Sequence, residues 1–194
     1  MKTPIKAILA AAAAIMPVIA TMAPAQAQHL RIGLREDPDI LDPTLSRTYV
    51  GRIVYMALCD KLFDINERLE IVPQLATAFR WEDPRTLLIT IREGVRFHDG
   101  TAMDAEAVRY SLNRHLTMQG SFRRSEIADM EAVEAVDAKT VRIRLKAPSA
   151  SFMAALTDRA GMIVSPRAAE AAGRDFGRAP VCAGPIRFVE RVAQ

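Results

Sequence analysis

The segment from Thr86 to Val108 constrains the fold of this chain more than any other, because the order of its residues is typical of a strand, a tight turn and a helix start. Apolar side chains occupy alternate positions from Leu87 to Ile91, which places one apolar set on the buried face of a strand. Asp99-Gly100 then supplies a turn, since Gly adopts positive φ without steric cost. Asp104 stands where a helix beginning at Ala105 needs an N-cap acceptor.

The remaining sequence predicts a mixed α/β fold. Apolar residues at helical spacing indicate a helix over residues 50–58, with an inner face formed by Val50, Ile53, Val54, Ala57 and Leu58. In the helix after Asp104, the side chains expected to face the interior are those of Val108, Ser111, Leu112 and His115. Strands are predicted at residues 30–34, 62–65, 130–136, 140–145, 162–164 and 186–192, with 130–145 forming a hairpin. A short helix is expected at residues 151–157, and another begins at Pro166.

The N-terminus is typical of a secretory signal peptide. Lys2 and Lys6 precede an apolar stretch over residues 7–20, and Ala25-Gln26-Ala27 is a small-x-small cleavage site. The apolar stretch is shorter than the ~20 residues that span a bilayer. We therefore expect residues 1–27 to be a signal peptide, cleaved after Ala27, and the mature chain to be periplasmic.

Charge and motif patterns exclude several classes of function. The formal net charge is +3, and Lys2 and Lys6 account for two of these charges, so the mature chain offers no basic patch for nucleic acid. His98-Asp99 could act as a base with its orienting carboxylate, but adjacent residues after a strand favour a turn with a surface histidine. The three histidines lack the spacing of metal ligands, and no serine has a G-x-S-x-G context. We expect no enzymatic activity, no metal and no cofactor.

The segment from Ile91 to Val108 resembles the signature of the bacterial extracellular solute-binding proteins, family 5. These proteins serve ABC importers of dipeptides, oligopeptides, nickel and related solutes. The family form is Leu-Arg-x-Gly-Val-x-Phe-His-Asp-Gly-Thr followed by a helix with Ala-Glu-Asp-Val. This chain has Ile91-Arg92-Glu93-Gly94-Val95-Arg96-Phe97-His98-Asp99-Gly100-Thr101 and then Ala105-Glu106-Ala107-Val108. Ala107 replaces the usual acid, which removes a carboxylate from the first helical turn without affecting the fold.

A second stretch also resembles the family. The usual Pro-Val-Gly-Thr-Gly-Pro-Tyr-Lys-Phe appears here as Pro180-Val181-Cys182-Ala183-Gly184-Pro185-Ile186-Arg187-Phe188. The Gly-Pro pair is kept, whereas Cys182 and Ile186 depart from the pattern. The loss of an aromatic side chain at Ile186 puts any stacking role there in doubt.

The resemblance implies an α/β fold of the periplasmic-binding-protein-like type II, of which the chain carries only the N-terminal part. Residues 28–57 would begin lobe I, residues 58–164 would form a small inserted α/β domain, and residues 165–194 would return to lobe I. Family members are much longer than this chain, so we expect a fragment that lacks the facing lobe.

The implied function is that of a monomeric periplasmic protein that closes around a peptide-like small solute and delivers it to the permease and ATPase of an ABC importer. By position, the ligand contacts would be Asp37, Asp39, Ile40, Leu41, Thr48 and Tyr49. The loop acids Asp37, Asp39 and Asp42 could face a cationic amine or be solvated. A free-standing periplasmic interaction or scaffold domain without a transport role remains the alternative.

Cys59 and Cys182 are a candidate disulfide. An even number of cysteines in an oxidising compartment favours a bond, and by the resemblance both residues lie near the two chain crossings between lobe I and its insert. Two buried free thiols are the alternative, because cysteine is among the most buried residue types.

Overall fold

The computed structural model describes residues 30–192, so the predicted signal peptide and its cleavage site lie outside the described residues. A compact unit begins at Leu34, and residues 30–33 are separate from it. None of the helices in the described part of the chain is both long and apolar enough to cross a membrane.

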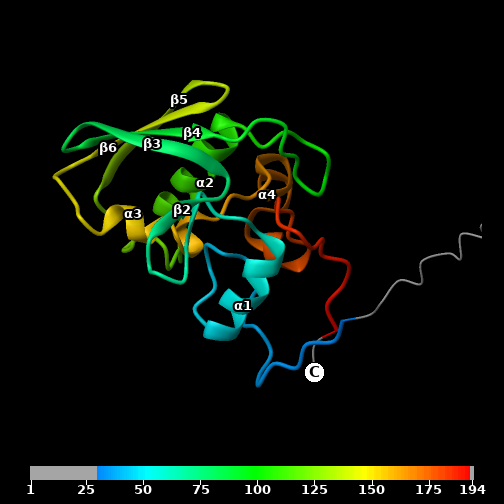
Figure 1. Ribbon diagram of the computed structural model, residues 1–194. Helices are drawn as coiled ribbons and strands as arrows, with labels where there is room; N and C mark the ends of the chain where they lie inside the picture. The colour runs from blue at the N-terminus through cyan, green and yellow to red at the C-terminus, as the bar shows by residue number, and fades with distance from the viewer. Residues whose placement is uncertain (1–29, 193–194) are drawn as a thin grey trace, which may run out of the picture. The chain divides into compact units, whose positions relative to one another are not determined.

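A four-stranded antiparallel sheet with strand order β3-β4-β6-β5 forms the larger part of this unit (Figure 1). Its strands are β3 (Ala76–Asp83), β4 (Thr86–Ile91), β5 (Met130–Asp137) and β6 (Thr140–Leu145). The alternation in β4 has the predicted effect, since Leu87, Ile89 and Ile91 are buried. The predicted hairpin is confirmed, because β5 and β6 pair with Val133 opposite Ile143.

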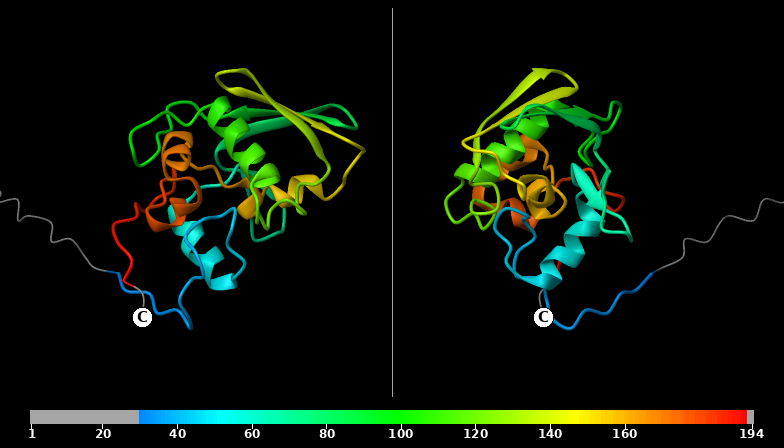
Figure 2. Two further views of the ribbon diagram at one scale, coloured as in Figure 1. Left: turned by 180° about the vertical axis from the view of Figure 1, so that it is seen from behind. Right: turned by 60° about the vertical axis from the view of Figure 1, so that its left-hand side comes forward.

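Helix α2 (Ala105–Thr117) covers one face of this sheet (Figure 2). The predicted cap is present, because the Asp104 carboxylate accepts a hydrogen bond from Ala107 N at 3.0 Å. Gly100 has a φ of 82°, as the predicted turn requires. The inward-facing residues of α2 are also confirmed, since Val108, Ser111, Leu112 and His115 are all fully buried. The main hydrophobic core lies between α2 and the sheet.

The rest of the unit consists of short elements, some of which pack into the main core and some into a second, smaller hydrophobic cluster. They are α1 (Tyr49–Leu58), β1 (Phe63–Ile65), β2 (Ile71–Pro73), α3 (Phe152–Ala155), η1 (Arg159–Gly161), α4 (Pro166–Ala172) and η2 (Gly173–Arg178). Pro166 is the first residue of α4, as predicted, and the Ser165 side chain caps this helix. The second cluster brings α1 against the segments that flank α4.

Helix α1 is present where predicted, but its buried face is rotated from the predicted one. Ile53 is 37% exposed, and the fully buried residue in the middle of the helix is Tyr55. The Tyr55 hydroxyl accepts a hydrogen bond from Asp42 N at 2.8 Å. We attribute the rotation to this polar contact, which an apolar pattern does not reveal.

Three predicted strands are wrong. Residues 30–34 and 186–192 form no strand, and their apolar side chains Leu30, Ile32, Val189 and Val192 are exposed. Residues 162–164 form only isolated bridges, from Met162 to Lys61 and from Val164 to Cys182. A strand is stabilised by hydrogen bonds to a neighbouring strand, and none of these segments has a continuous partner within the described residues.

Candidate functional site

The loop before α1 contains the predicted ligand contacts, and Asp39 organises it. The Asp39 carboxylate accepts hydrogen bonds from Ser46 Oγ at 2.7 Å, Arg47 N at 2.7 Å and Thr48 Oγ1 at 3.0 Å. Partial burial raises the pKa of Asp39, but these hydrogen bonds outweigh it and hold the pKa at about 2. Thr48 in turn caps α1 by accepting from Gly51 N at 3.0 Å. Asp39 and Thr48 therefore build the helix start together.

The other predicted ligand contacts, Asp37, Ile40, Leu41 and Tyr49, do not share the hydrogen-bonded turn of Asp39 and Thr48. Asp37 and Leu41 line a surface groove of about 400 Å³, together with Val54, Leu58 and residues 187–191. Asp37 lies 3.7 Å from the Arg191 guanidinium across this groove. Ile40 is half-buried against Gly177, and Tyr49 is 63% exposed at the start of α1. The structure therefore brings Asp37 together with Leu41, and Asp39 with Thr48, but not all six residues.

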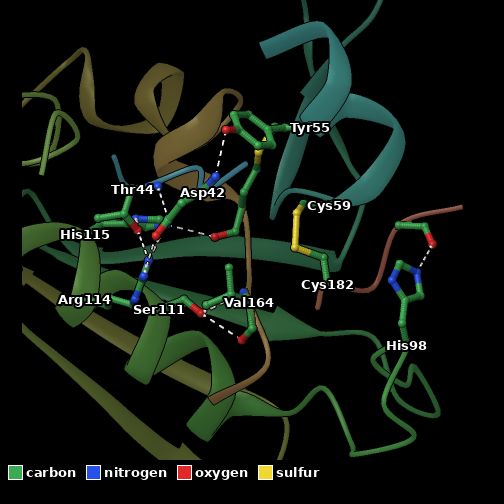
Figure 3. Close-up of a disulfide and its surroundings, with 12 residues drawn as sticks. Asp42, Thr44, Tyr55, Cys59, His98, Ser111, Arg114, His115, Val164 and Cys182 are labelled. Carbon is green, nitrogen blue, oxygen red and sulfur yellow. Dashed lines mark hydrogen bonds and ion pairs between the residues drawn. A yellow bond between two sulfur atoms is a disulfide. The ribbon is translucent and has the colours of Figure 1, made fainter. Parts of the chain in front are cut away.

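A buried ion pair joins the loop to α2 (Figure 3). The Arg114 guanidinium donates from Nη1 to Asp42 Oδ1 at 2.9 Å and from Nη2 to Asp42 Oδ2 at 2.6 Å. Asp42 is fully buried, and its Oδ1 also accepts from Thr44 N at 2.9 Å. The Arg114 guanidinium lies over the Phe176 ring at 5.2 Å. Asp42 is therefore not a solvated loop acid, and it is not free to bind a ligand amine.

His115 lies beside Thr44 (Figure 3) and extends this network to the backbone of Met162. Its Nε2 lies 3.0 Å from the Met162 carbonyl oxygen, which only accepts, so Nε2 carries the hydrogen. Its Nδ1, 2.9 Å from Thr44 Oγ1, then accepts the hydroxyl hydrogen. Full burial lowers the pKa of His115 to about 4. The ring is therefore a neutral connector, and neither nitrogen is free to bind a metal.

Cys59 and Cys182 form a disulfide at the place where the chain leaves α1 and where it returns after α4 (Figure 3). Their Cα atoms are 4.9 Å apart, and their separation in the sequence is 123 positions. Next to the bond, Gly184 N donates to the Leu58 carbonyl at 2.9 Å. A Cβ atom on Gly184 would overlap the Leu58 carbonyl, so glycine is required for this close approach.

The signature loop also contacts the returning chain. His98 Nε2 donates to the Gly184 carbonyl at 2.8 Å, and His98 N donates to the Cys182 carbonyl at 2.9 Å. Asp99 Oδ2 accepts from Ser165 Oγ at 2.7 Å. Burial raises the pKa of Asp99, but the hydrogen bonds from Thr101 and Ser165 outweigh it and lower the pKa to about 2. His98 is thus half-buried and bonded to the returning chain, and the predicted surface histidine is wrong.

These contacts join three segments that are far apart in sequence: the loop before α1, the start and face of α2, and the return after α4. The polar side chains of the network bond to one another, and no group of three or more His, Cys, Asp or Glu that could hold a metal occurs among the described residues. Sequence reasoning missed Arg114 and the role of His115, because nothing in the local pattern identifies their partners. One feature of the sequence could have indicated these contacts: the polar residues Ser111 and His115 interrupt the apolar face of α2.

Comparison with known proteins places this fold in a family. Residues 70–194 match the sequence model of bacterial extracellular solute-binding proteins, family 5, middle region. The glutathione-binding protein GsiB of Pectobacterium atrosepticum is 32% identical over 151 residues, which cover 77% of this chain and 29% of the relative. GsiB of Salmonella paratyphi A is 30% identical over 182 residues, which cover 93% of this chain and 34% of the relative.

Solved structures agree with this assignment. The binding protein AgaA of Agrobacterium tumefaciens R10, in complex with agropinic acid, has a TM-score of 0.75 and 28% identity over 80% of this chain and 32% of its own. The murein tripeptide binding protein MppA of Escherichia coli has a TM-score of 0.74 and 26% identity over 82% of this chain and 35% of its own. The chain therefore spans about one third of the length of these relatives. The expected type II fold of periplasmic binding proteins is confirmed for the part that the chain covers. Since the matched residues are more than half of the sequence, the chain belongs to the bacterial extracellular solute-binding proteins of family 5.

Proposed function

We propose that this chain is part of a periplasmic solute-binding protein that captures a small solute and delivers it to the permease and ATPase of an ABC importer. The observation that carries this proposal is the match of residues 70–194 to family 5. The protein acts by binding and not by catalysis, as a monomer, after removal of residues 1–27 as a signal peptide. Its ligand-binding candidates are the six residues named in the sequence analysis, from the loop before α1 and the first residue of α1.

The proposed division of the chain explains the contacts around α1. Residues 28–57 and 165–194 belong to lobe I, and residues 58–164 form the insert. The Cys59–Cys182 bond, the Asp42–Arg114 pair and the His98–Gly184 hydrogen bond all join these parts. Lobe I and its insert therefore move as one body, and closure on the solute takes place between this body and a second lobe.

Small organic acids and short peptides are the proposed class of solute. The relatives at about 30% identity are named for glutathione, and similar structures are described as complexes with agropinic acid and mannopinic acid. Each of these solutes carries a carboxylate at neutral pH. Another similar structure is that of a nickel ABC transporter protein, so the fold alone does not determine the solute.

Solute uptake tests this function. The reading frame that contains this chain is deleted in the source bacterium, and uptake of labelled glutathione, tripeptide and opine acids is measured with and without a plasmid copy. We expect the deletion to abolish uptake of one of these acids and the plasmid copy to restore it. Unchanged uptake of all of them, with no permease or ATPase gene beside the frame, would support the scaffold-domain alternative. Hydrolysis of the peptides by the purified product would contradict a function based on binding alone.

A further inference from the structure

The signature loop, residues 97–101, is a turn that holds its own shape. Gly100 N donates to the Phe97 carbonyl at 2.8 Å, and Phe97 N donates to the Thr101 carbonyl at 2.9 Å. Asp99 Oδ1 accepts from Thr101 N at 3.0 Å and from Thr101 Oγ1 at 2.6 Å. These internal bonds leave Asp99 Oδ2 and the His98 ring for partners outside the loop.

His98 binds the chain that returns after α4. Its backbone N donates to the Cys182 carbonyl at 2.9 Å, and its Nε2 donates to the Gly184 carbonyl at 2.8 Å. The two acceptors lie two residues apart, so one histidine bonds to carbonyls that a neighbouring strand would otherwise satisfy. On its other side, the same segment donates from Gly184 N to the Leu58 carbonyl at 2.9 Å. The returning chain is therefore held between the signature loop and the end of α1.

Asp99 binds a different place, the start of α4. Its Oδ2 accepts from Ser165 Oγ at 2.7 Å and from Arg167 Nε at 3.3 Å, and its backbone carbonyl accepts from Arg167 Nη2 at 2.9 Å. Ser165 Oγ in turn accepts from Ala168 N at 3.3 Å as the cap of α4. Because Asp99 takes the hydroxyl hydrogen of Ser165, a lone pair of that oxygen is directed to the helix. The Asp99 side chain is 13% exposed, so these bonds are largely shielded from water.

Two adjacent residues thus reach two separate parts of the chain. Ser165 is 66 positions from Asp99, and Gly184 is 86 positions from His98. In the proposed division of the chain, the signature loop belongs to the insert, whereas both of these partners belong to lobe I. The contacts of one short loop therefore fix two parts of lobe I at once.

We propose that the signature loop is a latch that fixes the insert on lobe I, with His98 holding the returning chain and Asp99 holding the start of α4. The inference rests on the proposed division of the chain, and it makes His98 and Asp99 positioning residues and not ligand contacts. His98 binds backbone carbonyls, so its bonds do not depend on which side chain stands at position 182. Cys182 therefore departs from the family pattern without loss of the latch.

Hydrogen exchange in the product of the whole reading frame, measured by mass spectrometry of its peptides, tests the latch. His98→Ala removes the side-chain hydrogen bond to Gly184, so we expect about five-fold faster exchange in residues 180–186. His98→Gln keeps a side-chain donor and should exchange within about two-fold of the wild type. Asp99→Asn has one accepting side-chain oxygen in place of two, and should instead loosen residues 165–168. Exchange in β4 and β6 should be unchanged in all three variants.

The disulfide supplies a second readout. Cys59 and Cys182 are each 1% exposed, so a reductant reaches their bond only after a local opening. Dithiothreitol transfers two electrons to the bond, which yields the two cysteine thiols and the cyclic disulfide of the reagent. Alkylation and peptide mapping follow the reaction. We expect reduction to be about five-fold faster in His98→Ala than in the wild type, and close to the wild-type rate in His98→Gln.

Arg96→Gln is the matched control, because Arg96 lies beside the same loop and its Nη1 donates to the Gly100 carbonyl at 2.9 Å, within the loop. Both readouts should keep their wild-type values in this variant. Three results would each overturn the latch: wild-type exchange or reduction in His98→Ala, an equal rise of exchange in β4 and β6, or the same change in Arg96→Gln. If His98→Ala does not fold, the wild type decides, because residues 180–186 without protection from exchange would also overturn the latch.

Uptake by the deletion strain tests the proposed function separately. Loss of uptake on deletion, together with unaltered exchange in His98→Ala, would refute the latch alone. Unchanged uptake, together with the expected exchange, would support the latch and count against the transport function.

Discussion

Around the four-stranded sheet, the stabilising contacts are mostly apolar and many join neighbours in sequence. Around α1, a smaller apolar cluster is supplemented by polar and covalent contacts that join distant segments. The β5–β6 hairpin pairs residues only a short loop apart. Asp42 and Arg114 are separated by 72 positions, His98 and Gly184 by 86, and the two cysteines by 123. In the sheet region, the stabilisation is spread over many buried apolar side chains. The region around α1 also depends on a few directional bonds between distant residues. Single changes around α1 should therefore have larger effects than single changes on the sheet surface.

Removal of the disulfide should have the largest effect. Cys59→Ser/Cys182→Ser frees a loop of 123 positions, which in the chain-entropy model lowers the free energy of unfolding by about 4–5 kcal/mol. Urea unfolding of the variant and of the oxidised wild type measures this difference. Alkylation without reductant, followed by mass spectrometry, should label no thiol in the wild type, and two labelled thiols would contradict the bond.

Arg114→Met should have the next largest effect. It leaves the Asp42 carboxylate buried without its partner, at a cost of about 3–5 kcal/mol. Asp42→Asn/Arg114→Met removes both charges and should lose clearly less than the sum of the two single variants. Additive losses in urea unfolding would show that the two side chains are not coupled.

Acidification should weaken the region around α1 through His115. The pKa of its ring is lowered by burial from 6.5 to about 4 in the folded chain, so the unfolded chain binds more protons between these values. Stability is then complete above pH 6.5 and falls toward pH 4, by up to about 1.4 kcal/mol per pH unit. Thermal unfolding across this range measures the slope.

His115→Gln is the control for this slope, because glutamine keeps one donor for Met162 and one acceptor for Thr44 but does not titrate. Its stability should change less between pH 6.5 and 4 than that of the wild type. An equal slope in both proteins would assign the pH dependence to other groups. Asp99, whose pKa is about 2, should contribute a separate loss only below pH 4, as its carboxylate becomes protonated.

Changes on the sheet side should have the smallest effects. Asp104→Ala removes the side-chain cap of α2 and should cost about 1 kcal/mol in urea unfolding. Arg144→Gln breaks an exposed pair with Glu131, in which both side chains are about half exposed, and should cost less than about 0.5 kcal/mol. If either loss matched that of Arg114→Met, the contrast between the two regions would fail.

The same contrast explains how much of the molecule could be predicted from the sequence. Strand β4, the β5–β6 hairpin and the cap and inner face of α2 follow from local alternation, helical spacing and turn residues, and all four were predicted. The strands at residues 30–34 and 186–192 were wrong, because apolar alternation indicates a capacity to pair but not the presence of a partner. The prediction of a strand at residues 162–164 was wrong for the same reason.

The contacts around α1 were less predictable, because each depends on which distant segments the fold brings together. Asp42 stands beside Asp37 and Asp39 in the sequence, yet only Asp42 is buried against Arg114. His98 looked like a turn residue, since its acceptor, Gly184, lies in a segment that sequence alone does not place next to it.

The central claim is that this chain carries one wall of a solute site and not the complete site. Calorimetric titration of glutathione and of opine acids into the 194-residue chain and into the product of its whole reading frame tests it most directly. We predict micromolar binding of one such acid by the whole product and none of comparable affinity by the 194-residue chain. Equally tight binding by both proteins would contradict the account.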